Sequence, residues 1–446
     1  MTSLVARWND VIAPDIRRWW TRNDVVILRF AVALMSLDAL VWLGYAFRRL
    51  VWETDSLSAV DLKSRYLEVH QWFAGANVYG EIITAVYPPA TYAMLLPILG
   101  WISLAQARWL WAILTLFAIA GLVVLVVRES HAQGFLEKAF FALIFLATYP
   151  VGSAIGNGQQ DVITLALLLA GIFLVRRERG SWRSDLLAAP LLLASLAKPT
   201  NAAPFFWIVI FAAGRWLPVA LAFVGYLGLT WVAASYQPDA IWDVLRGWLV
   251  SSSGIAKYVG PVFYANVHTW LAMLGMKAWM LPASAIVLAV LGWWMWRHRH
   301  ADIWILIGVA AVVTRFWTYH RVYDDVLILL TLVALFRIAK QDSLTHSRDV
   351  IAGILLVIVV VTMLAPPALF IVPPPWNIVF TIWETSLWFT VLAFLLVGER
   401  RQQRHCATAG GTRPSIADPA RLGERPRRQT SPPCSIRSAV HRRGYC

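Results

Sequence analysis

Charged residues are scarce in this sequence: they make up 14% of 446 residues, whereas hydrophobic residues make up 59% and the mean hydropathy is +0.61. Soluble globular domains carry about 25% charged residues, and their cores cannot hide so much apolar surface. The shortage of charge therefore excludes an ordinary water-soluble protein. It predicts an all-α protein that crosses the lipid bilayer many times.

Cysteines and nucleotide-binding motifs are missing from the hydrophobic part. Cys406, Cys434 and Cys446 all lie beyond residue 400, which leaves the membrane part without a disulfide framework or a cysteine-based metal site. The sequence also has no nucleotide-binding loop and no internal repeat. We expect no metal ion and no cofactor. No cleavable signal peptide is expected either, because the first apolar run is too long and begins too late.

The positive charge is concentrated at one end. The formal net charge is +14, but ten arginines against Asp418 and Glu424 give residues 401–446 a charge of +8, which leaves +6 for the rest. This distribution argues against a nucleic-acid partner. Residues 398–446 are predicted to form a basic, disordered cytoplasmic tail. The tail is either solvated or docked on the anionic headgroups of membrane lipids.

Apolar runs that could cross about 30 Å of hydrocarbon, at about 20 residues each, define a membrane domain over residues 25–397. A basic cytoplasmic N-terminus over residues 1–24 precedes it. Several of the runs are short, so the pairs of runs around Asn157 and Pro199 could instead be broken or tilted helices. About twelve helices are predicted, over residues 25–46, 109–127, 138–155, 161–175, 184–197, 200–213, 216–235, 278–296, 302–315, 325–339, 350–371 and 376–397.

The arginines and lysines predict the orientation, because short cytoplasmic loops hold the excess of these residues. All basic clusters fall on one side if residues 90–99 do not cross, so this segment is predicted to be re-entrant or interfacial. Both termini are then cytoplasmic. The opposite face receives a long first outer loop, residues 47–108, and the segments 157–161, 198–199, 236–277, 317–325 and 373–376. Residues 236–277 are predicted to contain an interfacial amphipathic helix.

The first outer loop holds two candidate general bases. A carboxylate at the edge of an apolar medium has a raised pKa and can accept a proton from a hydroxyl, which accelerates transfer by about 10²- to 10⁴-fold. Asp61 and Asp55 both qualify. The alternative is a solvated loop acid paired with Lys63 or Arg65.

Amides and cations supply candidate binding groups. Asn157, Gln159 and Gln160 could hydrogen-bond sugar hydroxyls, unless residues 156–161 form only a tight turn with Asp161 as helix cap. Lys198 either reaches an anion or extends to the membrane surface.

A third polar segment follows residue 314. Arg315, His320 and Arg321 could hold a phosphate, with arginine binding it through two hydrogen bonds. Pairing with arginine is favoured over metal binding for Asp324 and Asp325. The aromatic residues of this segment also fit an interfacial belt.

Taken in order, these motifs resemble glycosyltransferase family 87. The motifs are Asp61-x4-Tyr66, residues 75–79 (Gly-Ala-Asn-Val-Tyr), Tyr87-Pro88-Pro89, Gly158-Gln159, Lys198-Pro199 and the His320 segment, within about residues 25–397. The resemblance implies a C-type glycosyltransferase fold and a polyprenyl-phosphate sugar donor.

By position, the resemblance places the family's catalytic aspartate on Asp61, with Tyr66 and Tyr87 nearby. Two features depart from the family pattern. The spacing from Asp61 to Tyr66 is longer than usual, which keeps Asp55 as an alternative, and the segment around His320 differs from the commoner Trp-x-His pattern.

The implied reaction is transfer of a hexose, above all mannose, from polyprenyl phosphate to a hydroxyl of a lipid or glycan acceptor. It would take place at the outer face of the cell membrane. Asp61 would deprotonate the acceptor, while Lys198, Arg315 and Arg321 would neutralise the leaving phosphate. The alternatives are transfer of arabinofuranose from a similar donor and, in a different class, a lipid or sugar transporter. A transporter should contain internal repeats.

Overall fold

The computed structural model describes residue 7 and residues 11–177, 181–254, 266–340, 348–370 and 372–409, with side chains as far as residue 397. Every regular element in these ranges is a helix. The chain divides into two compact units, Met1–Leu395 and Leu396–Cys446. The tail predicted over residues 398–446 is helical in its backbone through residue 409, and the rest of that prediction lies outside the described residues.

All twelve predicted apolar runs lie mainly in helices. One run, residues 138–155, is divided between α7 and α8, and another, residues 200–213, forms an α-, a 3₁₀- and a π-helical turn in succession (α11, η2 and η3). The bounds are α2 (Ala13–Val51), α6 (Leu104–Glu129), α7 (Gly134–Ala147), α8 (Tyr149–Asn157), α9 (Asp161–Arg177), α10 (Trp182–Ser195), α11 (Pro199–Ala202), η2 (Ala203–Phe205), η3 (Ile208–Ala212), α12 (Leu217–Ala234), α15 (Met280–Arg297), α16 (Ile303–Trp317), α17 (Ile328–Ala339), α18 (Arg348–Met363) and α19 (Trp376–Ala409).

Helix length limits which of these can cross a membrane. Five helical segments in the described residues are long and apolar enough: Ala13–Val51, Leu104–Glu129, Leu217–Ala234, Lys277–Arg297 and Trp376–Val397. The pair α7 and α8, bent by 44°, makes a sixth if it is one broken span. By contrast, α9 has 17 residues and rises about 26 Å, short of the roughly 30 Å of hydrocarbon. The chain is thus a membrane protein, but the prediction of about twelve crossings is not confirmed.

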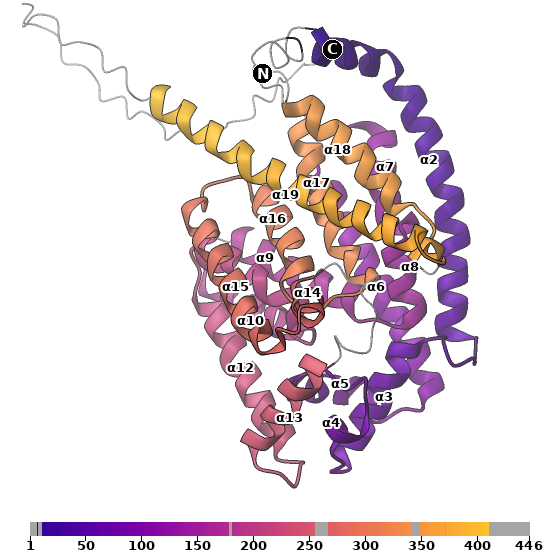
Figure 1. The fold of residues 1–446 in the computed structure, drawn as a ribbon, viewed down its shortest axis with the longest axis vertical. Coiled ribbons are helices and arrows are strands. Elements are labelled where there is room, and N and C mark those ends of the chain that lie inside the picture. Colours follow the sequence, from indigo (N-terminus) through magenta and orange to yellow (C-terminus); the bar gives the residue numbers. More distant parts are fainter. Residues whose placement is uncertain are drawn as a thin grey trace, which may run out of the picture. The chain divides into compact units, whose positions relative to one another are not determined.

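Two helices form the centre of the first unit. α16 and α17 pack on each other, and their side chains are buried on almost every side, with Trp304, Leu306 and Leu330 all at 0% exposure. Helices that are hydrophobic all round occupy such central positions. Around them, α17 packs on α18, and α2 runs along α7 and α8 (Figure 1).

Short helices fill the segments predicted to be outer loops. They are α3 (Val60–Phe73), α4 (Val78–Glu81), α5 (Pro89–Leu99), α13 (Ile241–Gly254), α14 (Val267–Met273) and η7 (Val322–Leu327). Two further short helices lie mainly in predicted apolar runs: η6 (Lys277–Trp279) at the start of the run 278–296, and η8 (Pro367–Phe370) near the end of the run 350–371. α5 has 11 residues, about 16 Å of rise, so its length agrees with a segment that does not cross. It packs on α12 and α3.

α13 lies where an interfacial helix was predicted. It holds the first outer loop through its side chains: Trp248 Nε1 donates to the Val86 carbonyl at 3.0 Å, and Ser251 Oγ donates to the Ala85 carbonyl at 2.6 Å. α3 is tied to the end of α12, because Trp72 Nε1 donates to the Ala233 carbonyl at 2.8 Å. These bonds fix the first outer loop against two distant parts of the sequence.

Candidate active site

A close backbone contact places Asp61. α8 ends at Asn157, and the next residue, Gly158, has a φ of +70° in the left-handed region. A Cβ on Gly158 would lie only 2.6 Å from Leu62 Cβ. The Ala59 amide also donates to the Gly156 carbonyl at 3.0 Å. The first turn of α3, which carries Asp61, is therefore pressed against the end of α8.

This contact gives a prediction for Gly158→Ala. The substitution adds backbone strain of about 1 to 2 kcal/mol and overpacking of about 1 to 3 kcal/mol. Gly214→Ala is the matched control, because Gly214 has a φ of +68° and a Cβ added there would meet nothing within 4 Å. In detergent, Gly158→Ala should lower the apparent melting temperature clearly more than Gly214→Ala. Equal losses of melting temperature in the two variants would mean that α3 can accommodate the added Cβ at Gly158.

Asp61 is a half-buried carboxylate with one unsatisfied oxygen. Its Oδ2 is buried and has no hydrogen-bond partner among the described residues. Burial raises the pKa of Asp61, and the charges of Arg321 and Arg65 with a hydrogen bond from Gln159 oppose that rise. A carboxylate with a raised pKa and a free lone pair is suited to accept a proton.

Asp55 has a different environment. It is exposed, and its Oδ1 accepts hydrogen bonds from the amides of Leu57 and Ser58 at 2.8 Å each. The Leu57 bond is the main cause that lowers the pKa of Asp55. Asp55 therefore stabilises a turn and lacks the raised pKa of a general base. The geometry favours Asp61 as the base.

Lys198 lies in a buried ion cluster. Its Nζ is 2.5 Å from both Asp161 Oδ1 and Asp324 Oδ1, and its side chain is 8% exposed. Asn201 Nδ2 donates to the same two oxygens, at 2.8 and 3.3 Å. Lys198 thus does not extend to the membrane surface. The Asp161 carboxylate is one of the two anions that bind its ammonium group.

The His320 segment joins this cluster through Asp324. His320 is fully buried with its Nδ1 3.4 Å from Asp324 Oδ2, and the Arg321 amide donates to that oxygen at 2.6 Å. Burial lowers the pKa of His320, while Asp324 opposes this. Burial alone would raise the pKa of Asp324, but Lys198 and His320 outweigh it and hold that pKa well below its usual range.

Arg321 carries a positive charge that acts on the catalytic candidate. Its Nε donates to the Tyr319 hydroxyl at 2.7 Å, and its charge is the strongest one acting to lower the pKa of Asp61. The predicted cation is therefore near the predicted base, although 260 residues separate the two positions, 61 and 321, in the sequence.

Arg315 lies in a neighbouring buried cluster. Its Nε binds Asp325, so the predicted pairing with arginine is confirmed for Asp325, whereas the Asp324 carboxylate pairs with Lys198 and His320 instead. The Tyr149 hydroxyl donates to Asp325 Oδ2 at 2.7 Å and also bonds Glu384 of α19. With 1% exposure and this partner, Arg315 anchors the start of η7 to α8, α16 and α19.

The two predicted tyrosines differ in placement. The Arg65 guanidinium lies 4.2 Å from the centre of the Tyr87 ring, and the pKa of Tyr87, raised by burial to about 12, also responds to the charges of Lys198 and Asp61. Tyr87 is therefore within electrostatic reach of both the base and the lysine cluster. Tyr66 instead donates to the Ile102 carbonyl at 3.0 Å and lies against His70, facing the turn between α5 and α6.

The predicted amides lie at the junction of α8 and α9. Asn157 is the last residue of α8 and is half-buried. Gln159 hydrogen-bonds Asp61. Gln160 Nε2 donates to the Ala197 carbonyl at 3.1 Å, and its Oε1 is buried without a partner among the described residues. Two of the three amides thus bind parts of the site: Gln159 binds the base, and Gln160 binds the segment just before Lys198.

Sequence reasoning missed Arg65 as a site residue. It follows Asp61 by four residues, which places both on one face of α3. Arg65 is 5% exposed; one nitrogen binds Glu68 and the Thr84 carbonyl, while Nε and Nη1 are buried and have no partner in the part of the chain that the structure describes. The i, i+4 spacing was the signal available in the sequence. Burial raises the pKa of Glu68 to about 7.

Unsatisfied polar atoms gather around Asp61 and Lys198. A buried polar group without a partner costs about 1 to 3 kcal/mol, so such a concentration of donors and acceptors is typical of a site that is completed by a polar ligand or water. Within the described ranges, the atoms are Asp61 Oδ2, Arg65 Nε and Nη1, Gln160 Oε1, Asp161 Oδ2 and Asn201 Oδ1.

Comparison with known proteins gives one match. The model of glycosyltransferase family 87 matches residues 85–314, slightly more than half of the 446 residues. Tyr87, Gln159 and Lys198 lie inside the match, whereas Asp61 and the segment from Arg315 to Arg321 lie outside it. No curated protein and no solved structure matches the chain. With its apolar helices, this chain belongs to glycosyltransferase family 87 and is a membrane glycosyltransferase.

Proposed function

We propose that this enzyme transfers a hexose, mannose above all, from a polyprenyl-phosphate donor to a hydroxyl of a lipid or glycan acceptor. The observation that carries the proposal is the position of Asp61, whose unsatisfied buried oxygen lies near the charges of Arg65 and Arg321. A base for the acceptor and cations for the leaving phosphate are the two needs of this reaction.

The proposed chemical step is one displacement. The acceptor hydroxyl gives its proton to the Asp61 carboxylate, and its oxygen forms a bond to C1 of the sugar. The bond from C1 to the phosphate oxygen breaks, and polyprenyl phosphate leaves with the electron pair. Arg321 and Arg65 stabilise the negative charge that grows on this phosphate. Direct displacement by one base inverts the configuration at C1.

The ion clusters change the roles first proposed for two cations. Lys198 faces two carboxylates, so its surroundings carry net negative charge and would repel a phosphate. We therefore assign Lys198 to holding α9, α11 and η7 together. Arg315, with its partner Asp325, anchors η7 in the same way, and Arg321 takes the contact with the phosphate.

The lipid-linked donor is supported by the sequence, which has no nucleotide-binding loop. The test is an assay of the purified full-length protein with a lipid extract as acceptor. We expect a labelled lipid or glycan product from polyprenyl-phosphate mannose and none from GDP-mannose. If product formed from polyprenyl-phosphate arabinofuranose instead, the transferred sugar would be a pentose. Uptake into vesicles without a new glycosidic bond would contradict the proposal.

The active site is proposed to face the outside of the cell membrane, within a C-type fold of about twelve crossings. The basic residues at the ends of α6, α9 and α15 support this orientation, because they lie at the helix ends opposite to Asp61 or its neighbours. In this arrangement α5 enters the membrane without crossing it.

Cysteine labelling tests the orientation. With Cys406, Cys434 and Cys446 replaced by serine, a cysteine at Ile83 or Ser103, both exposed, should react with an impermeant maleimide on intact cells. A cysteine at Arg299, also exposed, should react only after the membrane is permeabilised. The reverse pattern would place Asp61 in the cytoplasm.

A further inference from the structure

A cavity of about 460 Å³ lies between the C-terminal ends of α6 and α9 and the start of α16. α9 begins at Asp161 and ends at Arg177, and 16 steps along a helix rise about 24 Å. The cavity is therefore at the other end of α9 from the lysine cluster. It is not part of the candidate active site.

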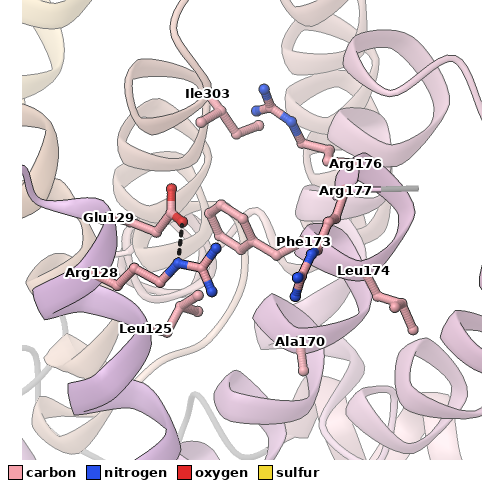
Figure 2. A pocket seen from close by; sticks show the side chains of 9 residues that line it. All are labelled: Leu125, Arg128, Glu129, Ala170, Phe173, Leu174, Arg176, Arg177 and Ile303. Atoms are coloured by element: carbon pink, nitrogen blue, oxygen red, sulfur yellow. Dashed lines mark ion pairs between the residues drawn. The ribbon is translucent and has the colours of Figure 1, made fainter. Parts of the chain in front are cut away.

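The polar lining of the cavity is strongly basic. Arg128 reaches in from α6, while Arg176 and Arg177 come from α9 on the opposite side (Figure 2). Among the described residues of the lining, Glu129 is the one acid, and it lies 3.8 Å from Arg128. Three arginines against one glutamate leave a charge of +2 in the wall. An anion is the ligand that this wall favours.

The remaining lining is apolar. It consists of Leu125 of α6, Ala170, Phe173 and Leu174 of α9 and Ile303 of α16. The Phe173 ring packs on the buried Trp304 at 5.6 Å between ring centres. A free phosphate ion would bind only the arginines, and the apolar side chains of the lining would stay in contact with water. A ligand that carries an anionic head on an apolar body satisfies both.

The acid beside the cavity does not cancel its charge. Asp302, which precedes Ile303, is bound by Arg337, whose Nη2 lies 2.6 Å from Asp302 Oδ2. Arg337 also donates to the Glu129 carbonyl at 2.6 Å, which fixes the end of α6 against α17. Asp302 is thus already paired with Arg337, and among the described residues of the lining the arginines outnumber the one glutamate.

From these observations we infer that the cavity binds the headgroup of an anionic phospholipid from the cytoplasmic leaflet, with Arg128 and Arg177 contacting its phosphate. The volume is within the roughly 300 to 1,000 Å³ of small-molecule sites. The apolar wall receives the glycerol backbone and the first carbons of an acyl chain. This site does not depend on the proposed transfer reaction, but its leaflet rests on the proposed orientation of the helices.

Native mass spectrometry of the full-length protein in detergent tests this site by titration with phosphatidylglycerol and with phosphatidylcholine of the same acyl chains. Arg128→Ala with Arg177→Ala should weaken the tightest phosphatidylglycerol binding about thirtyfold, which is about 2 kcal/mol at about 1 kcal/mol per cation. Glu129→Gln should tighten it about fivefold. Phosphatidylcholine carries the same phosphate with a compensating cation, so it should bind more weakly, and its binding should change less than that of phosphatidylglycerol in either variant.

The matched control removes two exposed arginines from the end of α15, Arg297→Ala with Arg299→Ala. It should leave the phosphatidylglycerol affinity within about twofold of the wild type, since these residues do not line the cavity. Equal losses in both double variants would show a diffuse basic surface and overturn the site. Competition by glycerol 3-phosphate as strong as that by phosphatidylglycerol would show an anion site that does not use the apolar wall, and would overturn the lipid assignment.

Discussion

Asp61→Asn should lower kcat for sugar transfer by about 10²- to 10⁴-fold, the usual contribution of a positioned general base. Asparagine keeps the shape of the side chain and can still accept the Gln159 hydrogen bond, but it cannot take up the proton of the acceptor. Donor binding should be nearly unchanged, because the proposed phosphate contacts belong to Arg65 and Arg321. Single-turnover assays and donor-binding titrations of the purified protein measure the two effects separately.

Asp55→Asn is the control within the same loop. Its carboxylate is exposed and bonded to two turn amides, so the variant should retain transfer within a few-fold of the wild type. If Asp55→Asn lost activity while Asp61→Asn kept it, the role of base would move to Asp55. Full activity in both variants would show that neither aspartate of this loop acts as a general base.

The second large effect is expected from Lys198→Met. The substitution leaves Asp161 and Asp324 buried without their shared cation, and breaking a buried ion pair from one side costs about 3 to 5 kcal/mol. The variant should melt at a clearly lower temperature in detergent. It should also lose transfer through displacement of η7, which lies between α16 and α17 in the chain and follows Arg321 directly. Melting curves and activity at a permissive temperature measure both losses.

A double variant separates this role from a phosphate contact. Lys198→Met with Asp161→Asn removes one of the two uncompensated charges, so it should recover part of the melting temperature. Lys63→Met is the matched control, because the Lys63 ammonium binds the Asp55 carbonyl and the Ser58 hydroxyl at the loop surface. A Lys198→Met protein with wild-type stability and a raised donor KM alone would favour the direct phosphate contact first predicted for Lys198.

The helices were largely predictable from the sequence, whereas the crossings were not. Apolar composition over 15 or more residues favours a helix in or near a bilayer, and each predicted run is helical. Whether a run crosses depends on its continuity, and single residues can interrupt it. Thr148 separates α7 from α8 with extended backbone, and Pro199 to Ala212 changes helix type twice. The break at Thr148 was not visible in average hydropathy, whereas the one at Pro199 lies where the sequence had left a broken helix open.

The members of the candidate site were easier to select from the sequence than their partners. Asp61, Gln159, Lys198 and Arg321 were identified one by one from residue type and position. That Lys198 binds Asp161 and Asp324 could not be predicted, because these positions are 37 and 126 residues from Lys198 in the sequence and only the packing of α9, α11 and η7 joins them. Asp325 shows the opposite case: its partner Arg315 is only ten residues away, and pairing of this aspartate with an arginine was predicted, although without naming which arginine.

The central claim, that Asp61 is the base and Arg321 its neighbouring cation, is tested most directly by the pH dependence of kcat/KM. Burial raises the pKa of Asp61 and Arg321 opposes that rise, so activity should fall as the pH drops through a pKa above the usual value of about 4. In Arg321→Gln the acid limb should move to higher pH, because a charge that favours the carboxylate is gone. The buried Glu68 also has a raised pKa, about 7, so Glu68→Gln is measured alongside and should keep an acid limb. An acid limb that stays in place in Arg321→Gln, or that disappears in Glu68→Gln, would contradict the account.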